Sequence, residues 1–328
     1  MKIGVVLAAL AGLLGAAYLI FYVGFDAVWG TVTSIGWGGF AILLLYGAAN
    51  FILLGFAWFL LVPPHNWRSA MTFCWGRAVR DSAGDVLPFS QLGGMVIGAR
   101  ATILRGVTTA KAFGSTVVDI TIEMVAQIAF IVLGLGILAF RLPLKSEHLD
   151  TVEWALAGIV LAMLAAGAFV IVQRRGFSYL ERIAERFLPK AAAHAAAIDR
   201  VINEIHAMPK RMMLSFLLHF TGWISSAFAT WLALELIGTP AAFTSAIAIE
   251  SLLCAARSAA LFVPAAIGVQ EAGYAVMMPL FGLTPEIGIA VSLLKRAREI
   301  GVGAPVLLSW QIAEGGHAAA KSKAEKGT

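Results

Sequence analysis

Charged side chains stand at the centre of an apolar stretch near the C-terminus. Residues 287–310 read IGIAVSLLKRAREIGVGAPVLLSW, with four charged residues in the middle: Lys295, Arg296, Arg298 and Glu299. A charge at the centre of a membrane-spanning helix costs roughly 2.5–3.5 kcal/mol on insertion scales. One helical turn separates Lys295 from Glu299, so this pair is expected to neutralise itself. An arginine left over in a cavity can bind a carboxylate, or a phosphate through two parallel hydrogen bonds.

Carboxylates occur at helical spacing in a second apolar stretch. Asp119, Glu123 and Gln127 are spaced i, i+4 and i+8, which puts them on one face of a helix. That face is expected to look into the protein, because carboxylates facing lipid are costly. Two readings stay open, namely a stripe of salt bridges that holds the helix in place and a direct role in transport.

Arginines precede these carboxylates in the chain. Arg77 and Asp81 are one turn apart and can pair. Arg80 and Arg100 are then available either to bind an anionic group or to pair with the carboxylates at 119 and 123.

A third set of charges lies between residues 250 and 271. Arg257 follows IESLLCAA and precedes SAALFVP, so it is expected to lie deep in the membrane. Glu271 falls at the expected start of a short helix, where a carboxylate is favoured. It is expected to cap that helix or to pair with Arg257 or Arg296.

The overall composition tells which elements must position these charges. The chain has 328 residues, of which 60% are hydrophobic and 13% charged, and its mean hydropathy is +0.85. Because a bilayer is crossed by about 20 apolar residues, we predict an all-α polytopic membrane protein with a single membrane domain over 1–328. Six full spans are expected, at 3–25, 36–62, 115–140, 152–173, 212–237 and 285–312.

Two stretches between these spans, 68–108 and 241–282, are too interrupted to cross the membrane as single helices. The residues that break them are Pro88, Gly93, Gly94, Pro264 and Gly268. Broken backbone at membrane depth must be buried in protein or line a wet cavity. We therefore predict two re-entrant hairpins, one opening from each side of the membrane, as in the inverted repeats of transporters.

Loop charges predict the orientation. The segment 174–211 holds eight Lys and Arg residues, whereas 26–35 holds none. The positive-inside rule then places 174–211 and both termini in the cytoplasm. The amphipathic pattern of 174–211 favours helices that lie on the inner surface of the membrane.

Signals for other kinds of site are weak. Cys74 and Cys254 show no disulfide framework and no metal spacing, and the sequence has no Walker loop and no nucleophile elbow. We therefore predict no catalytic residues, no metal ligands, no cofactor and no nucleic-acid partner, and leave the oligomeric state open.

Four segments carry a family resemblance: RAVRDSAGDVLPFSQLGGMVIGAR, STVVDITIEMVAQIAFIVLGLG, FVPAAIGVQEAGY and GLTPEIGIAVSLLKRARE. Together they resemble the membrane region of the lysylphosphatidylglycerol synthase superfamily, also described as flippase-like. The likeness covers about residues 30 to 312 and is closest to the hopanoid-biosynthesis-associated branch.

The resemblance implies a multi-pass protein of the bacterial inner membrane that moves or handles lipid. The soluble transferase domain of the lipid-aminoacylating members is absent from this sequence, so synthase activity is not expected. The family's charged motif positions fall on Arg77, Arg80, Arg100, Asp119, Glu123, Gln270, Glu271, Lys295, Arg296, Arg298 and Glu299. One departure is Met95, where the family tends to carry a glutamate after the double glycine.

Three functions remain open from the sequence. The first is translocation of a hopanoid or another polar-headed lipid, or an accessory role in it, with Arg257 among the binding residues. The second is a membrane-embedded lipid-modifying enzyme or subunit that uses Asp119 and Glu123 as acid–base groups. The third is a non-catalytic scaffold for lipid-biosynthesis enzymes.

Overall fold

The computed structural model describes residues 30, 33–86, 91–141, 189–259, 266 and 268–326. These residues form helices joined by short turns, and no strand occurs among them. The helices, in chain order, are α3 (Gly36–Phe59), α4 (Trp67–Val86), α5 (Gln91–Leu104), α6 (Thr109–Arg141), α8 (Pro189–His206), α9 (Pro209–Ile237), α10 (Phe243–Ala259), α11 (Val269–Met277), the 3-10 helix η3 (Met278–Phe281) and α12 (Pro285–Lys326).

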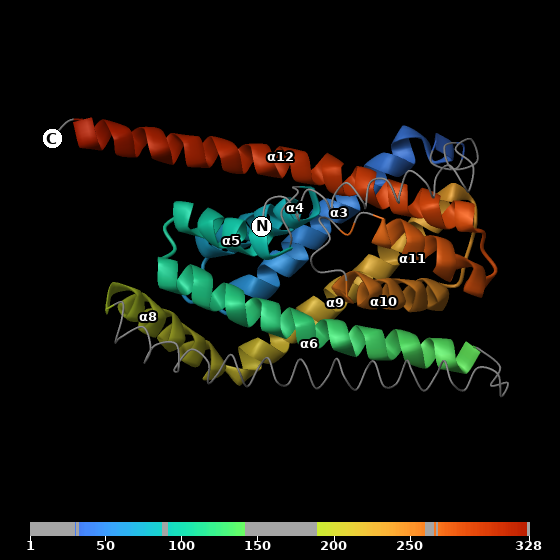
Figure 1. The fold of residues 1–328 in the computed structure, drawn as a ribbon, viewed down its shortest axis with the longest axis horizontal. Coiled ribbons are helices and arrows are strands. Elements are labelled where there is room, and N and C mark those ends of the chain that lie inside the picture. Colours follow the sequence, from blue (N-terminus) through green and yellow to red (C-terminus); the bar gives the residue numbers. More distant parts are fainter. Residues whose placement is uncertain are drawn as a thin grey trace.

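Three of the described helices are long and apolar enough to cross a membrane. They are α3, α6 and α9, and they coincide with the spans predicted at 36–62, 115–140 and 212–237. The predicted spans 3–25 and 152–173 lie outside the described residues. The predicted span 285–312 is helical throughout as the first part of α12. Figure 1 shows α12 along one side of the molecule, with its C-terminal part extending beyond the other helices.

The two interrupted stretches each form a pair of short helices. Helices α4 and α5 pack against each other, as do α10 and α11. Gly94 makes the first contact possible, because a Cβ there would lie 2.5 Å from the backbone oxygen of Arg80. Gly98 is equally close to the Arg80 side chain. Gly94 and Gly98 therefore allow α4 and α5 to pack closely.

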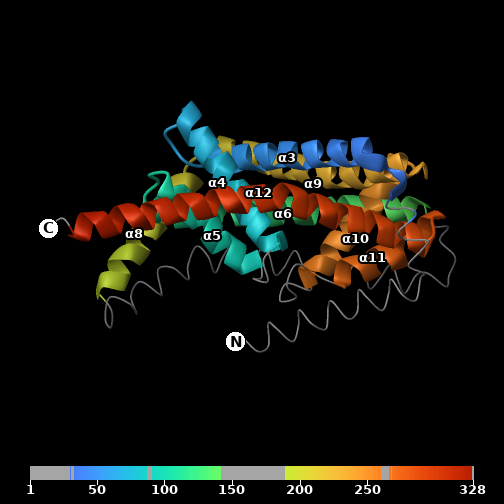
Figure 2. The same cartoon turned by 90° about the horizontal axis from the view of Figure 1, so that it is seen from above.

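The packing pattern of α3–α6 is repeated by α9–α12. Helix α4 packs on α12, and its counterpart α10 packs on α6. In the same way α3 contacts α12 while α9 contacts α6, and the two first helices, α3 and α9, lie side by side (Figure 2). Each short-helix pair is thus held between the two halves. This exchange of partners is the contact pattern expected of a repeat, although the predicted re-entrant geometry stays a prediction.

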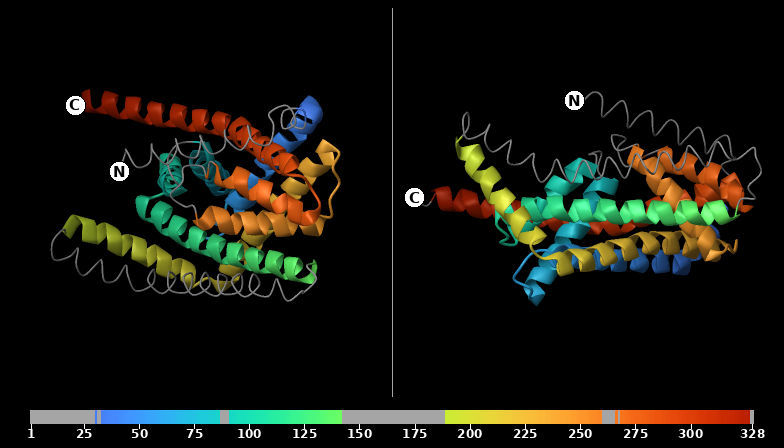
Figure 3. Two further views of the ribbon diagram at one scale, coloured as in Figure 1. Left: turned by 45° about the vertical axis from the view of Figure 1, so that its right-hand side comes forward. Right: turned by 90° about the horizontal axis from the view of Figure 1, so that it is seen from below.

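Helix α8 forms most of the described part of the predicted surface segment 174–211. It lies beside the start of α6 (Figure 3), where a Cβ on Gly114 would meet Val201 at 3.0 Å. Ile202 and Ile205 of α8 are buried in a cluster with Trp58. The apolar face of α8 therefore packs on the protein.

Candidate functional site

The carboxylates of α6 are bound by the arginines of α4. Arg77 donates to both oxygens of Glu123, at 2.9 and 2.5 Å. Arg80 donates to Asp119 at 2.7 Å and to Glu123 at 2.6 Å. The predicted pair of Arg77 with Asp81 also forms, at 2.7 Å. Both guanidinium groups are buried, so this first network fastens α4 to α6.

Histidine 219 joins this first network and was not singled out in the sequence. Its Nε2 lies 2.9 Å from an oxygen of Asp119, and both side chains are fully buried. The Trp58 indole N–H donates to Ser115 of α6 nearby, and Arg80 lies over the Trp58 ring. The available signal was one histidine within the apolar run MMLSFLLHFTGW of α9.

A second network surrounds Glu250 of α10. Lys295 of α12 lies 2.8 Å from this carboxylate, so the predicted neutralisation of Lys295 by Glu299 is wrong. Glu250 also accepts hydrogen bonds from Thr230 at 2.5 Å and from Tyr274. Lys295 pairs with another helix because its side chain faces α10. Glu299 instead lies close to Asp85, at the end of α4.

A third network lies at the start of α11. Glu271 forms an ion pair with Arg296, which is one of the two partners predicted for it. The same carboxylate accepts the backbone N–H of Gly268 at 2.7 Å, as an N-terminal cap. Gln270 donates to Ser292 of α12 at 3.1 Å, and Ser292 donates to Glu271. Glu271 therefore caps the helix and also ties it to α12.

A fourth group of charges lies where the two short-helix pairs meet. Arg257, in the last turn of α10, is 3.8 Å from Asp85, in the last turn of α4. Arg298 of α12 is 3.6 Å from its neighbour Glu299. Asp85 also interacts electrostatically with both of these α12 residues. We call these four residues the central cluster.

Arg100 and Gln127 lie apart from the networks. Arg100 is not near Asp119 or Glu123, since it pairs with Glu314 of α12 at 2.7 Å on an exposed surface. The hydrogen bond from Arg100 lowers the pKa of the Glu314 carboxyl. Gln127 donates to Ser258 of α10 at 2.7 Å.

The structure also describes part of the predicted breaks. Pro88 and Pro264 lie outside the described residues, whereas Gly93 and Gly94 lie in the first turn of α5. Gly268 precedes α11 with φ of +82°, a left-handed conformation that favours glycine. Met95 is half-buried on α5, one residue after this glycine pair.

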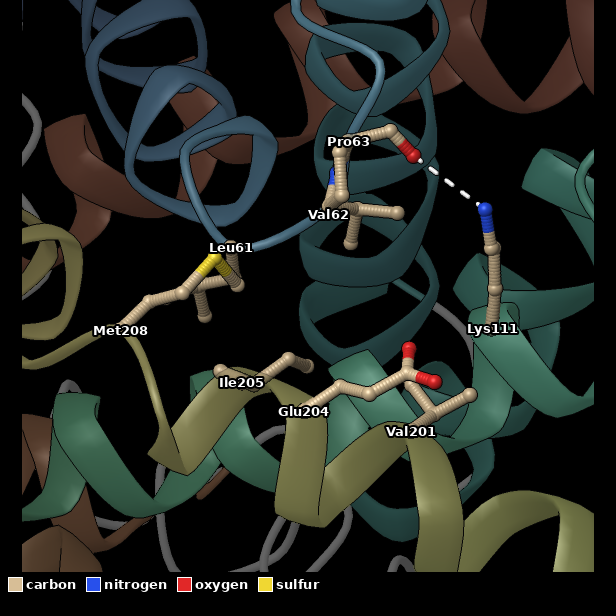
Figure 4. A pocket seen from close by; sticks show the side chains of 8 residues that line it. All are labelled: Leu61, Val62, Pro63, Lys111, Val201, Glu204, Ile205 and Met208. Carbon is tan, nitrogen blue, oxygen red and sulfur yellow. Dashed lines mark hydrogen bonds between the residues drawn. The ribbon is translucent and has the colours of Figure 1, made fainter.

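A small pocket of about 100 Å³ lies at another place, between the end of α3, α6 and α8 (Figure 4). Its walls are mainly apolar, including Leu61, Ile205 and Met208. Lys111 at its edge donates to the backbone oxygen of Pro63 at 3.3 Å. None of the predicted site residues lines this pocket, so the central cluster is the better candidate.

Within the described residues, no group of three or more His, Cys, Asp or Glu side chains could hold a metal ion.

Comparison with known proteins agrees with this membrane architecture. The family model described as lysylphosphatidylglycerol synthase TM region matches residues 4–304. No curated protein and no solved structure matches the chain. The branch associated with hopanoid biosynthesis stays a prediction. Because the match spans most of the sequence, the chain belongs to the family of the lysylphosphatidylglycerol synthase transmembrane region.

Proposed function

We propose that this protein translocates a polar-headed lipid, such as a hopanoid, across the bacterial inner membrane. The lipid head group would pass between the two hairpins, 68–108 and 241–282, while its tail stays in the bilayer. Both termini would lie in the cytoplasm. The family membership supports a membrane role connected with lipid.

The observation that carries this proposal is the difference between the central cluster and the other networks. Arg77 and Arg80 are saturated by carboxylates at 2.5–2.7 Å and are 3% and 5% exposed. Arg257 and Arg298 have only long ion pairs and are 30% and 18% exposed. Intramembrane charges that are not fully neutralised mark substrate pathways.

The same comparison bears on the enzyme alternative. An acid–base pair must exchange protons with a substrate that it can reach. Asp119 and Glu123 instead accept hydrogen bonds from two arginines, and His219 contacts Asp119. This arrangement favours a structural role for the two carboxylates.

A transport assay tests the proposal. The full chain would be reconstituted in liposomes with head-labelled lipid, and a membrane-impermeant quencher would report how fast inner-leaflet label becomes accessible. We expect faster exposure than in empty liposomes, and loss of it in Arg257→Gln. Lys210→Gln, which removes an exposed charge at the start of α9, is the matched control.

Two results would count against translocation. Exposure no faster than in empty liposomes, with both a labelled phospholipid and a labelled hopanoid, would favour the scaffold. Chemical conversion of the lipid by the purified protein would favour the enzyme.

A further inference from the structure

One ion pair joins the tips of the two hairpins, where α4 and α10 end. Asp85 closes α4 and Arg257 closes α10, and their charged atoms lie 3.8 Å apart. Within the described ranges no other ion pair links 68–104 with 241–281. Each of the other intramembrane networks joins a hairpin to a long helix. The Asp85–Arg257 pair therefore is the electrostatic contact that holds the hairpin ends together.

The arginines of the central cluster have unused hydrogen-bonding capacity. A guanidinium carries five N–H donors. Neither Arg257 nor Arg298 donates a hydrogen bond to any residue in the described part of the chain, and their ion-pair distances are 3.8 and 3.6 Å. Donors withdrawn from water without acceptors are costly. An acceptor with several oxygens would satisfy both groups.

The neighbouring helices pack closely around the cluster and leave one further polar group without a partner. Helix α3 has a glycine, Gly47, where a Cβ would lie 3.1 Å from the Arg298 side chain. On α4, one turn before Asp85, the Ser82 hydroxyl is buried and has no hydrogen-bond partner among the described residues. It packs towards α12, where a Cβ on Gly303 would lie 3.3 Å from it. A further polar group thus stands unpaired one turn from the cluster.

We propose that Arg257 and Arg298 bind the phosphate of an anionic lipid head group, and that Asp85 is an internal counter-ion which this phosphate displaces from Arg257. The proposal rests on the proposed function and names the substrate class. Planar guanidinium groups match the oxygens of a phosphate in geometry. The charge of Glu299 and the weak Asp85 contact together keep Arg257 compensated while the site is empty.

A mechanical consequence follows from the displacement. When phosphate takes the place of Asp85 on Arg257, the ion pair between the hairpin ends is broken. The saturated networks that fasten α4 to α6 and α10 to α12 are unchanged by this exchange. Substrate binding therefore loosens the hairpins at their meeting point and leaves their outer attachments intact.

A binding experiment on the full chain in detergent tests the site. The probe is dioctanoyl phosphatidylglycerol, compared with the neutral dioctanoylglycerol and with glycerol phosphate, which lacks the tails. The dissociation constant would be measured by intrinsic tryptophan fluorescence for wild type and for Arg257→Gln, Arg298→Gln, Asp85→Asn and the control Lys210→Gln.

We expect each arginine variant to weaken binding of the anionic lipid by about tenfold or more, because charge-assisted hydrogen bonds are lost. Asp85→Asn should tighten it by a few-fold, since it removes the competing charge. Lys210→Gln should bind as wild type does. Should Asp85→Asn fail to give a monodisperse protein, Asp85→Ser makes the same test.

Three results would overturn the proposal. Unchanged or weaker binding in Asp85→Asn would show that the aspartate is no competitor. Equal binding of dioctanoylglycerol would exclude phosphate recognition, and equal binding of glycerol phosphate would identify a site for free anions. The liposome assay separates the two proposals, because intact binding without transport contradicts only the proposed function.

Discussion

Lys295 of α12 and Glu250 of α10 form a buried ion pair at 2.8 Å, with both side chains about 5% exposed. Burying two charges is offset only where good geometry and further hydrogen bonds satisfy them. Thr230 of α9 and Tyr274 of α11 supply such bonds to the carboxylate. Four helices of the second half therefore converge on one carboxylate.

Removing the lysine should destabilise the protein strongly. In Lys295→Met the charge of Glu250 stays buried without its cation, which costs about 3–5 kcal/mol. We expect a clearly lower melting temperature in detergent, followed by tryptophan fluorescence. The double variant Lys295→Met/Glu250→Gln should recover part of the loss, because the glutamine is neutral and still accepts hydrogen bonds. A double variant as unstable as the single one would show that the charge is not the cause.

Arg80, in the first network, can be compared with Arg105, an arginine outside it. Arg80→Met removes a partner from both Asp119 and Glu123, so we expect a loss of about 3–5 kcal/mol. Arg105, which is exposed and lies over the Trp75 ring at 4.2 Å, should lose only about 0.5–1 kcal/mol in Arg105→Met. Equal melting temperatures for the two variants would contradict this account of the network.

Close packing in the first hairpin should be sensitive to a single methyl group. In Gly94→Ala the added Cβ meets the Arg80 backbone oxygen at 2.5 Å, so α5 must move away from α4. Overpacking of this kind costs about 1–3 kcal/mol. Gly136 of α6 has open space around its Cβ position, so Gly136→Ala should be neutral or stabilising. Thermal melts of both variants check the difference.

The sequence was most informative about features that depend on local periodicity. The apolar runs predicted α3, α6 and α9 within a few residues, because helix length and hydrophobicity are read directly from the chain. Spacing also predicted the pair Arg77–Asp81. Gly268, a predicted break, directly precedes α11 and has a positive φ of +82°.

Partners across helices were harder to predict, because one helix can offer a charge to several neighbours. Lys295 has Glu299 at ideal spacing, yet it binds Glu250 on another helix. Arg100 was expected either to bind an anionic group or to pair with the α6 carboxylates, and it pairs with Glu314 of α12. No spacing in the sequence singled out Asp85. Its ion pair with Arg257 is seen only in the structure, where the ends of α4 and α10 lie close together.

Acidification should weaken the exposed contact between α5 and the end of α12. The folded-state pKa of Glu314 is lowered by the hydrogen bond from Arg100, so its contribution to stability is present above the ordinary glutamate pKa and is lost as pH falls through the lowered value. Glu314→Gln should cost less than about 1 kcal/mol at pH 7, as usual for surface pairs. Melts below about pH 4 should show a smaller difference between variant and wild type. A difference that grows on acidification would contradict this assignment.

The orientation of the hairpins yields the last prediction. Thr239 precedes α10 and Thr284 follows η3, so a re-entrant hairpin open to the outside places both on that side. His65 precedes α4 and Arg105 follows α5, so a first hairpin open to the cytoplasm places both on that side. Single cysteines at these four positions, in a background with the native cysteines replaced by serine, would be tested with a membrane-impermeant thiol reagent on intact and permeabilised cells.

We expect labelling of Thr239→Cys and Thr284→Cys on intact cells, and of His65→Cys and Arg105→Cys only after permeabilisation. For the second hairpin the reason is geometric, since at 1.5 Å per residue the 17 residues of α10 extend about 25 Å and the 9 residues of α11 much less. A bilayer core is about 30 Å thick, so neither helix reaches from one surface to the other. If the two flanks of one hairpin were labelled from opposite sides, that hairpin would cross the membrane, and the central cluster would no longer lie where two re-entrant ends meet.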